Sequence, residues 1–74
     1  MAYSGTTEAL LHAIKSDLRS RVDHIVEYAE FAAGTLGDPD EIETVLQFAL
    51  SRVEEALSEA AQAMAREIHL ERLR

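Results

Sequence analysis

Residues 34–43 read GTLGDPDEIE, and this stretch decides the fold because it combines signals that end one helix with signals that begin another. It holds the only proline of the chain and two of its three glycines. Glycine adopts the left-handed conformation of a helix C-terminus without a steric penalty. We therefore expect Gly34 or Gly37 to end a first helix in this conformation.

The residues that follow form a helix start. Asp38 is expected to be the N-cap, Pro39 the first helical residue and Glu41 the third, which is the spacing of a capping box. The carboxylates of Asp40, Glu41 and Glu43 then lie near the positive end of the helix dipole, where negative charge is favourable. The acidity of the turn thus has a structural explanation.

Before the turn, apolar residues recur at intervals of three and four, which is the period of a helix with one buried face. They are Leu11, Ile14, Leu18, Val22, Ile25, Ala29 and Ala32. Ser4, Thr6 and Thr7 are candidate N-caps, and we place the helix start near Thr7. The first helix is predicted at about residues 7–34, with the turn at 34–38.

The second helix, predicted at about residues 39–72, has two apolar lines about 90° apart around its axis. The bulky line consists of Leu46, Leu50, Val53, Leu57, Ala61, Met64 and Ile68. The alanine-rich line consists of Ile42, Val45, Ala49, Ala56, Ala60 and Ala63. Together they cover roughly 160°, more than the ~100° stripe of a helix with one neighbour. The second helix therefore needs two neighbours, and the first helix is one of them.

A short turn makes the two helices antiparallel. Thr7 is then expected level with residue 66, so that residues 67–74, EIHLERLR, extend beyond the first helix. A single hairpin buries little, and pairing two hairpins supplies the missing neighbour. The predicted fold is all-α: one domain over residues 1–74, in which an antiparallel two-helix hairpin dimerises into a four-helix bundle.

The charge is strongly acidic and unevenly placed. The chain has 14 acidic and 7 basic residues, for a formal net charge of −7. No Lys or Arg occurs between Val22 and Ser51, whereas the C-terminal end carries Arg66, Arg72 and Arg74. This asymmetry favours an antiparallel dimer, with each acidic turn beside the basic end of the second copy. The acidity also disfavours nucleic-acid binding, because phosphate contacts need a basic surface.

Composition also bears on location. The chain has no cysteine, which removes disulfides and cysteine-based metal sites. No apolar stretch approaches the ~18 residues of a membrane span. The N-terminal residues lack the basic segment and apolar core of a signal peptide. We expect a cytoplasmic protein with no membrane partner.

No motif for catalysis or cofactor binding is found. A di-iron bundle needs Glu-x-x-His pairs, and no Glu stands three residues before His12, His24 or His69. A Gly-x-Ser-x-Gly nucleophile elbow and a Gly-rich phosphate-binding loop are also lacking. We therefore expect no enzymatic activity, no metal and no cofactor.

Four side chains outside the apolar lines form a candidate interaction site: His24, Tyr28, Phe31 and Phe48. Helical register places them on one flank of the hairpin, with the two phenylalanines within about 10 Å of each other along the axis. Clustered aromatic side chains are typical of interfaces. One interpretation is that this flank is the dimer interface, and the other is that it binds a different protein.

Leu70 and Leu73, in the C-terminal tail, point away from the predicted bundle face. They are either exposed residues of a frayed helix end or part of a helix that docks into a groove of a partner.

The leading functional hypothesis is a non-enzymatic protein–protein interaction module. In this hypothesis, a small homodimeric regulator binds and inhibits a larger protein such as a transcription factor, in the manner of an anti-activator. One alternative is a structural or assembly subunit that provides dimerisation. Another is RNA binding, because paired helical hairpins resemble in outline the Rop-type RNA-binding bundle of plasmids. That resemblance implies a basic face, for which Lys15, Arg19 and Arg21 are the candidates.

Overall fold

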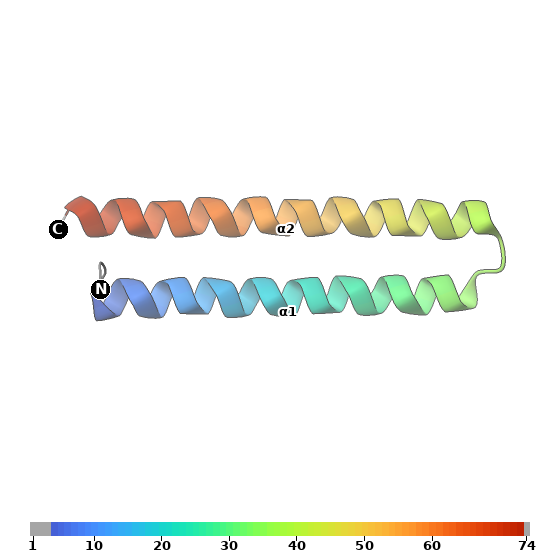
Figure 1. Cartoon of the computed structure of the whole chain (residues 1–74), viewed down its shortest axis with the longest axis horizontal. Coiled ribbons are helices and arrows are strands. Elements are labelled where there is room, and N and C mark those ends of the chain that lie inside the picture. Colours follow the sequence, from blue (N-terminus) through green and yellow to red (C-terminus); the bar gives the residue numbers. More distant parts are fainter. Residues whose placement is uncertain (1–3, 74) are drawn as a thin grey trace.

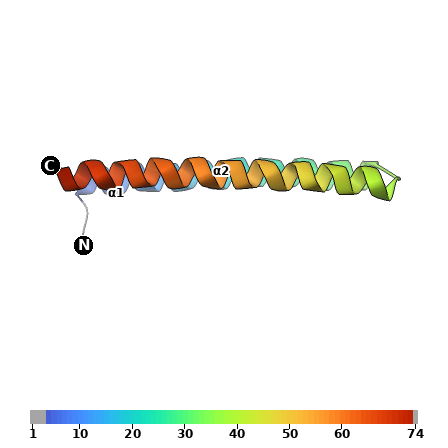
Figure 2. The ribbon, with the colours of Figure 1, turned by 90° about the horizontal axis from the view of Figure 1, so that it is seen from above.

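The computed structural model describes residues 4–73, which form two α-helices and no strand. Helix α1 spans Gly5–Thr35 and helix α2 spans Pro39–Leu73. The helices run antiparallel and side by side, joined by the short segment 36–38 (Figures 1 and 2). The prediction of an all-α helical hairpin is confirmed.

Helix α1 begins at Gly5 and not near Thr7. Ser4 is its N-cap, with an extended backbone (φ −67°, ψ 163°), and the Ser4 Oγ accepts a hydrogen bond from the Thr7 N–H at 3.2 Å. This bond satisfies one of the N–H groups that a helix start leaves without an intrahelical partner. The first of the three candidate caps is therefore the one that the chain uses.

The end of α1 differs from the predicted left-handed glycine. The helix continues through Gly34 to Thr35, and Leu36 leaves it in an extended conformation (φ −80°, ψ 139°) while its N–H bonds to the Ala32 carbonyl at 2.9 Å. No glycine among residues 4–73 has a positive φ. The glycine cap is therefore wrong. The extended Leu36 already reverses the chain and turns a half-buried side chain toward α2.

Replacing Gly34 by Ala is consequently expected to stabilise the protein. Gly34 lies within α1, and a Cβ at this position meets no atom within 4 Å. Alanine restricts the unfolded chain and should raise the free energy of unfolding by about 0.5–1 kcal/mol. Urea denaturation followed by circular dichroism, at one protein concentration for both variants, measures the change. A loss of stability would mean that Gly34 needs a conformation that alanine cannot adopt.

Asp38 provides the cap of α2. Its Oδ1 accepts a hydrogen bond from the Asp40 N–H at 3.0 Å, and its carbonyl accepts one from the Ile42 N–H at 3.0 Å. Among the described residues, no hydrogen bond joins the Asp38 N–H to the Glu41 carboxylate. The capping box is therefore half formed: Asp38 caps the helix that begins at Pro39, and Glu41 contributes its charge to the first turn.

The hairpin is a rod of 55 × 15 × 13 Å with a radius of gyration of 16.8 Å. A compact domain of this length has a radius of gyration of about 11 Å. Each helix therefore has one neighbour along its whole length. Among the residues that the structure describes, no helix has the length and hydrophobicity of a membrane span.

The alanine-rich line of α2 faces α1. Ala49 and Ala56 are buried, Ala56 completely, and Ala29 of α1 is also buried. The other members of the predicted apolar line of α1 are half-buried; they are Leu11, Ile14, Leu18, Val22, Ile25 and Ala32. Because the distance between packed helices depends on the side chains at the contact, alanines allow a close approach. Leu46, Leu50 and Leu57 of the bulky line remain exposed.

The end of α2 projects only slightly past the start of α1, less than the predicted overhang of residues 67–74 (Figure 1). Thr7 was predicted to lie opposite residue 66, but it contacts Glu71. Its Oγ1 donates a hydrogen bond to the Glu71 carboxylate at 2.9 Å. The prediction compared backbone positions alone, but helical side chains lean toward the N-terminus of their own helix. In an antiparallel pair the two side chains lean in opposite directions. Thr7 therefore meets a side chain that starts about one helical turn farther along α2.

Glu71 closes the open end of the hairpin. Its carboxylate accepts hydrogen bonds from the Ser4 N–H, from the Ser4 hydroxyl at 3.1 Å and from the Thr7 hydroxyl at 2.9 Å. Thr7 is fully buried, so Glu71 accepts from a hydroxyl that is shielded from water. The negative charge also lies at the positive end of the α1 dipole. We call this set of bonds the Glu71 clasp.

Glu71→Ala is expected to lower the free energy of unfolding by about 1–3 kcal/mol, because it removes bonds to a charged acceptor and leaves the buried Thr7 hydroxyl without that acceptor. Glu67→Ala is the matched control. Glu67 is half-buried one turn earlier on α2 and makes no hydrogen bond or ion pair within the described part of the chain. Urea midpoints at equal protein concentration compare the two. Equal losses would show that the clasp does not contribute to stability.

Candidate interaction surfaces

The fully buried positions of this hairpin hold small side chains, and many of its large apolar side chains are exposed. Among the described residues, the buried ones are three alanines and one threonine. The exposed large apolar side chains are Leu10, Val26, Tyr28, Phe31, Leu46, Phe48, Leu50, Leu57, Leu70 and Leu73. Folded proteins usually bury residues of these types, and contiguous exposed apolar surface marks interaction sites.

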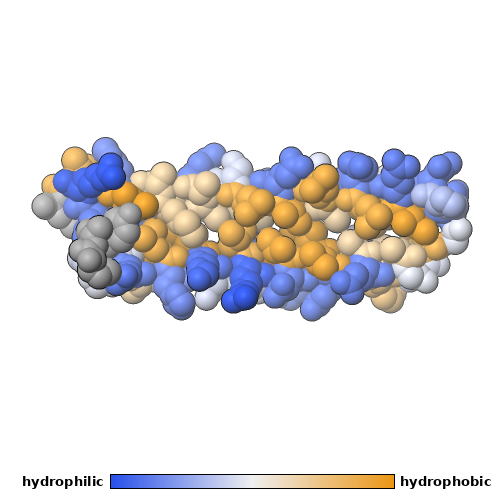
Figure 3. Space-filling view, viewed as in Figure 1, coloured by the Kyte–Doolittle hydropathy of each residue, from blue (hydrophilic) through white to orange (hydrophobic). Residues whose placement is uncertain are grey.

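One side of the hairpin carries an aliphatic face, which we define as Val26, Leu46, Leu50 and Leu57. The three leucines are spaced by four and seven residues and therefore share one side of α2. Leu50 is 51% exposed and Leu57 is 50% exposed. Leu57 lines a shallow groove together with Val22, which lies one turn before Val26 on α1. Figure 3 shows an apolar stripe of this kind, running along both helices between hydrophilic rims.

The opposite side carries the aromatic flank, which comprises the four predicted residues His24, Tyr28, Phe31 and Phe48. His24 lines a second groove with Arg52 and Glu55, and Arg52 lies 5.9 Å from the centre of the Phe48 ring. Glu55 and Leu57 are about 160° apart around α2 at 100° per residue. The two grooves, and with them the aliphatic face and the aromatic flank, are therefore on opposite sides of the helix seam.

All three aromatic rings of the flank are exposed: Phe31 by 73%, and Tyr28 and Phe48 by 59% each. Counted from the seam at 100° per residue, Phe31 points about 140° away from α2, so it lies at the outer edge of the flank. Phe48 and Arg52 are one helical turn apart on α2 and face the same way. The sequence prediction named Phe48 and missed Arg52, although the spacing of four residues was the available signal.

One ion pair joins the two helices on the side of the aromatic flank. Arg21 of α1 forms an ion pair with Glu59 of α2 at 2.8 Å. The hydrogen bond and the negative charge of Glu59 raise the pKa of Arg21, so the guanidinium stays charged at every physiological pH. His24 Nδ1 donates to the Ser20 carbonyl at 2.8 Å. The ion pair directs Arg21 across to α2, whereas the hydrogen bond to Ser20 keeps His24 close to the surface of α1.

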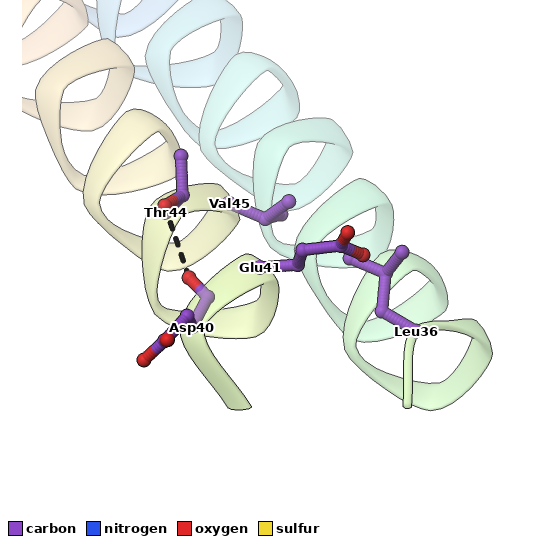
Figure 4. A pocket seen from close by; sticks show the side chains of 5 residues that line it. All are labelled: Leu36, Asp40, Glu41, Thr44 and Val45. Atoms are coloured by element: carbon purple, nitrogen blue, oxygen red, sulfur yellow. Dashed lines mark hydrogen bonds between the residues drawn. The ribbon is translucent and has the colours of Figure 1, made fainter. Parts of the chain in front are cut away.

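A hollow of about 420 Å³ lies at the turn end, where α1 meets the start of α2 (Figure 4). The turn-end hollow is lined by Leu36, Asp40, Glu41, Thr44 and Val45. Leu36 and Val45 supply apolar surface between the helices, and the Glu41 side chain extends across toward Leu36 (Figure 4). This orientation explains why Glu41 does not complete the capping box. The Thr44 hydroxyl donates to the Asp40 carbonyl at 3.0 Å.

The predicted docking tail is part of the hairpin. Leu70 and Leu73 are exposed, Leu73 more so, but both belong to α2. Glu71, between them in sequence, is held by the clasp to the start of α1. If these leucines dock into a partner, they do so from a helix end that the Glu71 clasp already holds against α1.

Within residues 4–73, no three His, Asp or Glu side chains gather closely enough to hold a metal ion. Comparisons with protein-family models, with curated proteins and with solved structures find no match for this chain. The surfaces described above are therefore the basis for a functional proposal.

Proposed function

We propose that this chain is a non-enzymatic protein–protein interaction module. In this proposal, two copies pack through their aliphatic faces into a four-helix bundle, and the homodimer binds and inhibits a larger protein. The observation that carries the proposal is the exposure of Leu46, Leu50 and Leu57 in a hairpin whose buried apolar residues are alanines. A second hairpin on this face gives α2 the second neighbour that its wide apolar surface requires.

The exposed area supports pairing of two copies. The accessible surface of the hairpin is 5584 Å², whereas a compact monomer of this mass exposes roughly 4,500 Å². The excess is about 1,000 Å², close to the ~800 Å² that each partner buries in a standard protein–protein interface. A bundle of two hairpins therefore removes the surface that distinguishes this rod from a compact domain.

Charge supports the antiparallel orientation of this dimer. The turn end carries Asp38, Asp40 and Glu41 and no basic residue, whereas the open end carries Arg66 and Arg72 together with Glu8, Glu67 and Glu71. An antiparallel pair places each acidic turn end beside the arginines of the mixed-charge open end of the second copy, and a parallel pair would place the two acidic turn ends together. Complementary charge of this kind selects orientation and suppresses the alternative.

The surfaces that remain free support binding to a larger protein. The aromatic flank and the turn-end hollow lie away from the aliphatic face and combine exposed rings with carboxylates. A transcription factor is a suitable target in this proposal, because an acidic surface can occupy the basic surface that such a protein uses for nucleic acid. RNA binding by this chain itself has less support, since Arg21 is already paired with Glu59.

Light scattering over a series of concentrations, with helicity followed by circular dichroism, tests the dimer. We expect a helical species of about twice the 8.2 kDa chain mass at every concentration. A helical monomer throughout would contradict the dimer. Affinity capture with the dimer from an extract of its native cells is then expected to recover one larger protein. Recovery of the chain alone, in large homo-oligomers, would contradict the regulatory role and favour an assembly subunit.

A further inference from the structure

Phe48 and the turn-end hollow are neighbours on α2, on the side away from the aliphatic face. Phe48 follows Val45 by three residues and Thr44 by four, so its ring stands next to the hollow on the surface of α2. The ring is 59% exposed. The hollow is bordered by Asp40 and Glu41 (Figure 4). The exposed ring of Phe48 follows it along α2.

We propose that the hollow and the Phe48 ring together bind a basic amphipathic helix of the larger protein. One large apolar side chain of that helix occupies the hollow against Leu36 and Val45, and a second packs on Phe48. The inference rests on the proposed function, because it states the chemistry by which the dimer recognises its target.

The spacing on α2 matches such a ligand. Val45 and Phe48 are about one helical turn apart, roughly 5 Å along the axis at 1.5 Å per residue. The anchor residues of an amphipathic helix, at positions i and i+3 or i+4, are separated by the same distance. A helix lying along the rod therefore brings successive anchors to the hollow and to the ring.

Charge selects a basic ligand over an acidic or neutral one. No Lys or Arg occurs between Val22 and Ser51, and the acids of this segment include Glu27, Asp40 and Glu41. Arg52, at the Phe48 ring, is the first cation beyond this segment on α2. These residues belong to the half of the rod that contains the turn (Figure 1). A helix with Lys or Arg beside its apolar anchors gains attraction at the rim of the contact, and that attraction decreases with salt.

A second copy of the chain fits the hollow and the ring less well than a different protein. The basic residues Arg66 and Arg72 lie at the opposite end of a rod 55 Å long. In the proposed dimer the second copy packs on the aliphatic face, so its Arg66 and Arg72 lie beside the turn end on that side and the hollow on the other side stays free. A further copy on the hollow would appear in light scattering as species larger than a dimer.

The test uses the intact dimer and a labelled helical peptide of about 18 residues, made only of Leu and Lys with Leu on one face. The control peptide has the same composition, with its sequence scrambled so that the leucines do not share a face. Fluorescence anisotropy gives the affinities, and NMR amide shifts locate the contact. We expect the amphipathic peptide to bind at least about tenfold more tightly than the scrambled one, with the largest shifts at Leu36, Thr44 and Val45.

Two variants sharpen this experiment. Phe48→Ser removes the exposed ring and is expected to weaken binding at least about tenfold, and Glu41→Lys is expected to weaken it further at low salt. Leu73→Ser is the matched control, since it removes a comparably exposed apolar side chain at the other end of the rod. The control should bind the peptide as the unmodified dimer does. Light scattering on each variant shows whether the dimer persists.

Several results would overturn the inference. Equal binding of both peptides would mean that charge alone acts, and shifts centred on Leu50 and Leu57 would mean that the peptide takes the aliphatic face. A Phe48→Ser variant that is monomeric would make the aromatic flank an interface between copies. If the dimer captures a larger protein but does not bind the peptide, this inference fails alone. If the chain neither dimerises nor captures a protein, the proposed function fails as well.

Discussion

The double variant Leu50→Asp, Leu57→Asp is expected to convert the proposed dimer into a monomer with little helix. Both leucines are about half exposed in the hairpin, so their remaining surface becomes buried only when a second copy packs on the aliphatic face. Four half-buried leucines per dimer contribute roughly 4 kcal/mol to association, and aspartate adds the cost of burying charge. The dimer dissociation constant should therefore rise at least about a thousandfold. Analytical ultracentrifugation and circular dichroism report mass and helicity together.

Phe48→Asp is the matched control for this prediction. Phe48 is 59% exposed, similar to the two leucines, but it lies on the aromatic flank. The introduced charge is the same, and the variant should remain a helical dimer. If instead the leucine variant stays dimeric and the Phe48 variant dissociates, the aromatic flank is the dimer interface, as the first of the two sequence-based interpretations held.

Ala56→Leu is expected to lower the melting temperature by roughly 5–20 °C, which corresponds to about 1–3 kcal/mol for a chain of this size. Ala56 has no exposed surface and lies where α2 meets α1. A leucine there adds three carbon atoms to a contact made close by alanines, so the helices must separate or shift. Thermal unfolding followed by circular dichroism at fixed concentration measures the effect.

Ala65→Leu separates packing from helix propensity. Ala65 is exposed on α2, and leucine and alanine have similar helix propensities. This control should melt close to the unmodified protein. If Ala56→Leu and Ala65→Leu melt alike, the alanine-rich line does not face α1, and the bulky line would have to take its place in the hairpin.

These two predictions test which apolar line of α2 packs against α1 and which packs against a second copy. The aspartate variants test whether the bulky line of α2 meets a second copy, and the leucine variant tests whether the alanine-rich line meets α1. A protein that tolerates both changes cannot have the arrangement described here. The two substitutions are therefore best made in parallel, with their controls.

Much of the fold could be predicted because its signals are local. Asp38 and Pro39 mark a helix start through bonds that span only a few residues. The apolar line from Leu11 to Ala32 repeats at the helical period and does face the neighbouring helix. The prediction of a left-handed glycine was wrong for a local reason as well. Gly34 permits that conformation but does not require it, and Leu36 reverses the chain without it.

The candidate sites could be predicted less well, because they depend on the rotation of each helix about its axis and on how closely the two helices pack. Helical periodicity identified two apolar lines on α2 but could not tell which one meets α1. It grouped Phe31 with Phe48 from their positions around each helix, yet did not find Arg52 beside Phe48 or the hollow between Leu36 and Val45. Periodicity also placed Glu71 beyond the N-terminal start of the first helix, whereas Glu71 contacts Ser4 and Thr7.

By itself, the sequence determined the two helices, the turn that joins them and the acidic character of one end, since capping, periodicity and charge are properties of neighbouring residues. Only the tertiary structure decided that alanines form the most buried part of the seam, that Leu46, Leu50 and Leu57 remain exposed and that Glu71 closes the open end. The physical reason is that the rotation and separation of packed helices are set by side-chain size at the contact and by the lean of each side chain toward its own N-terminus. Both become defined only when the second helix is in place.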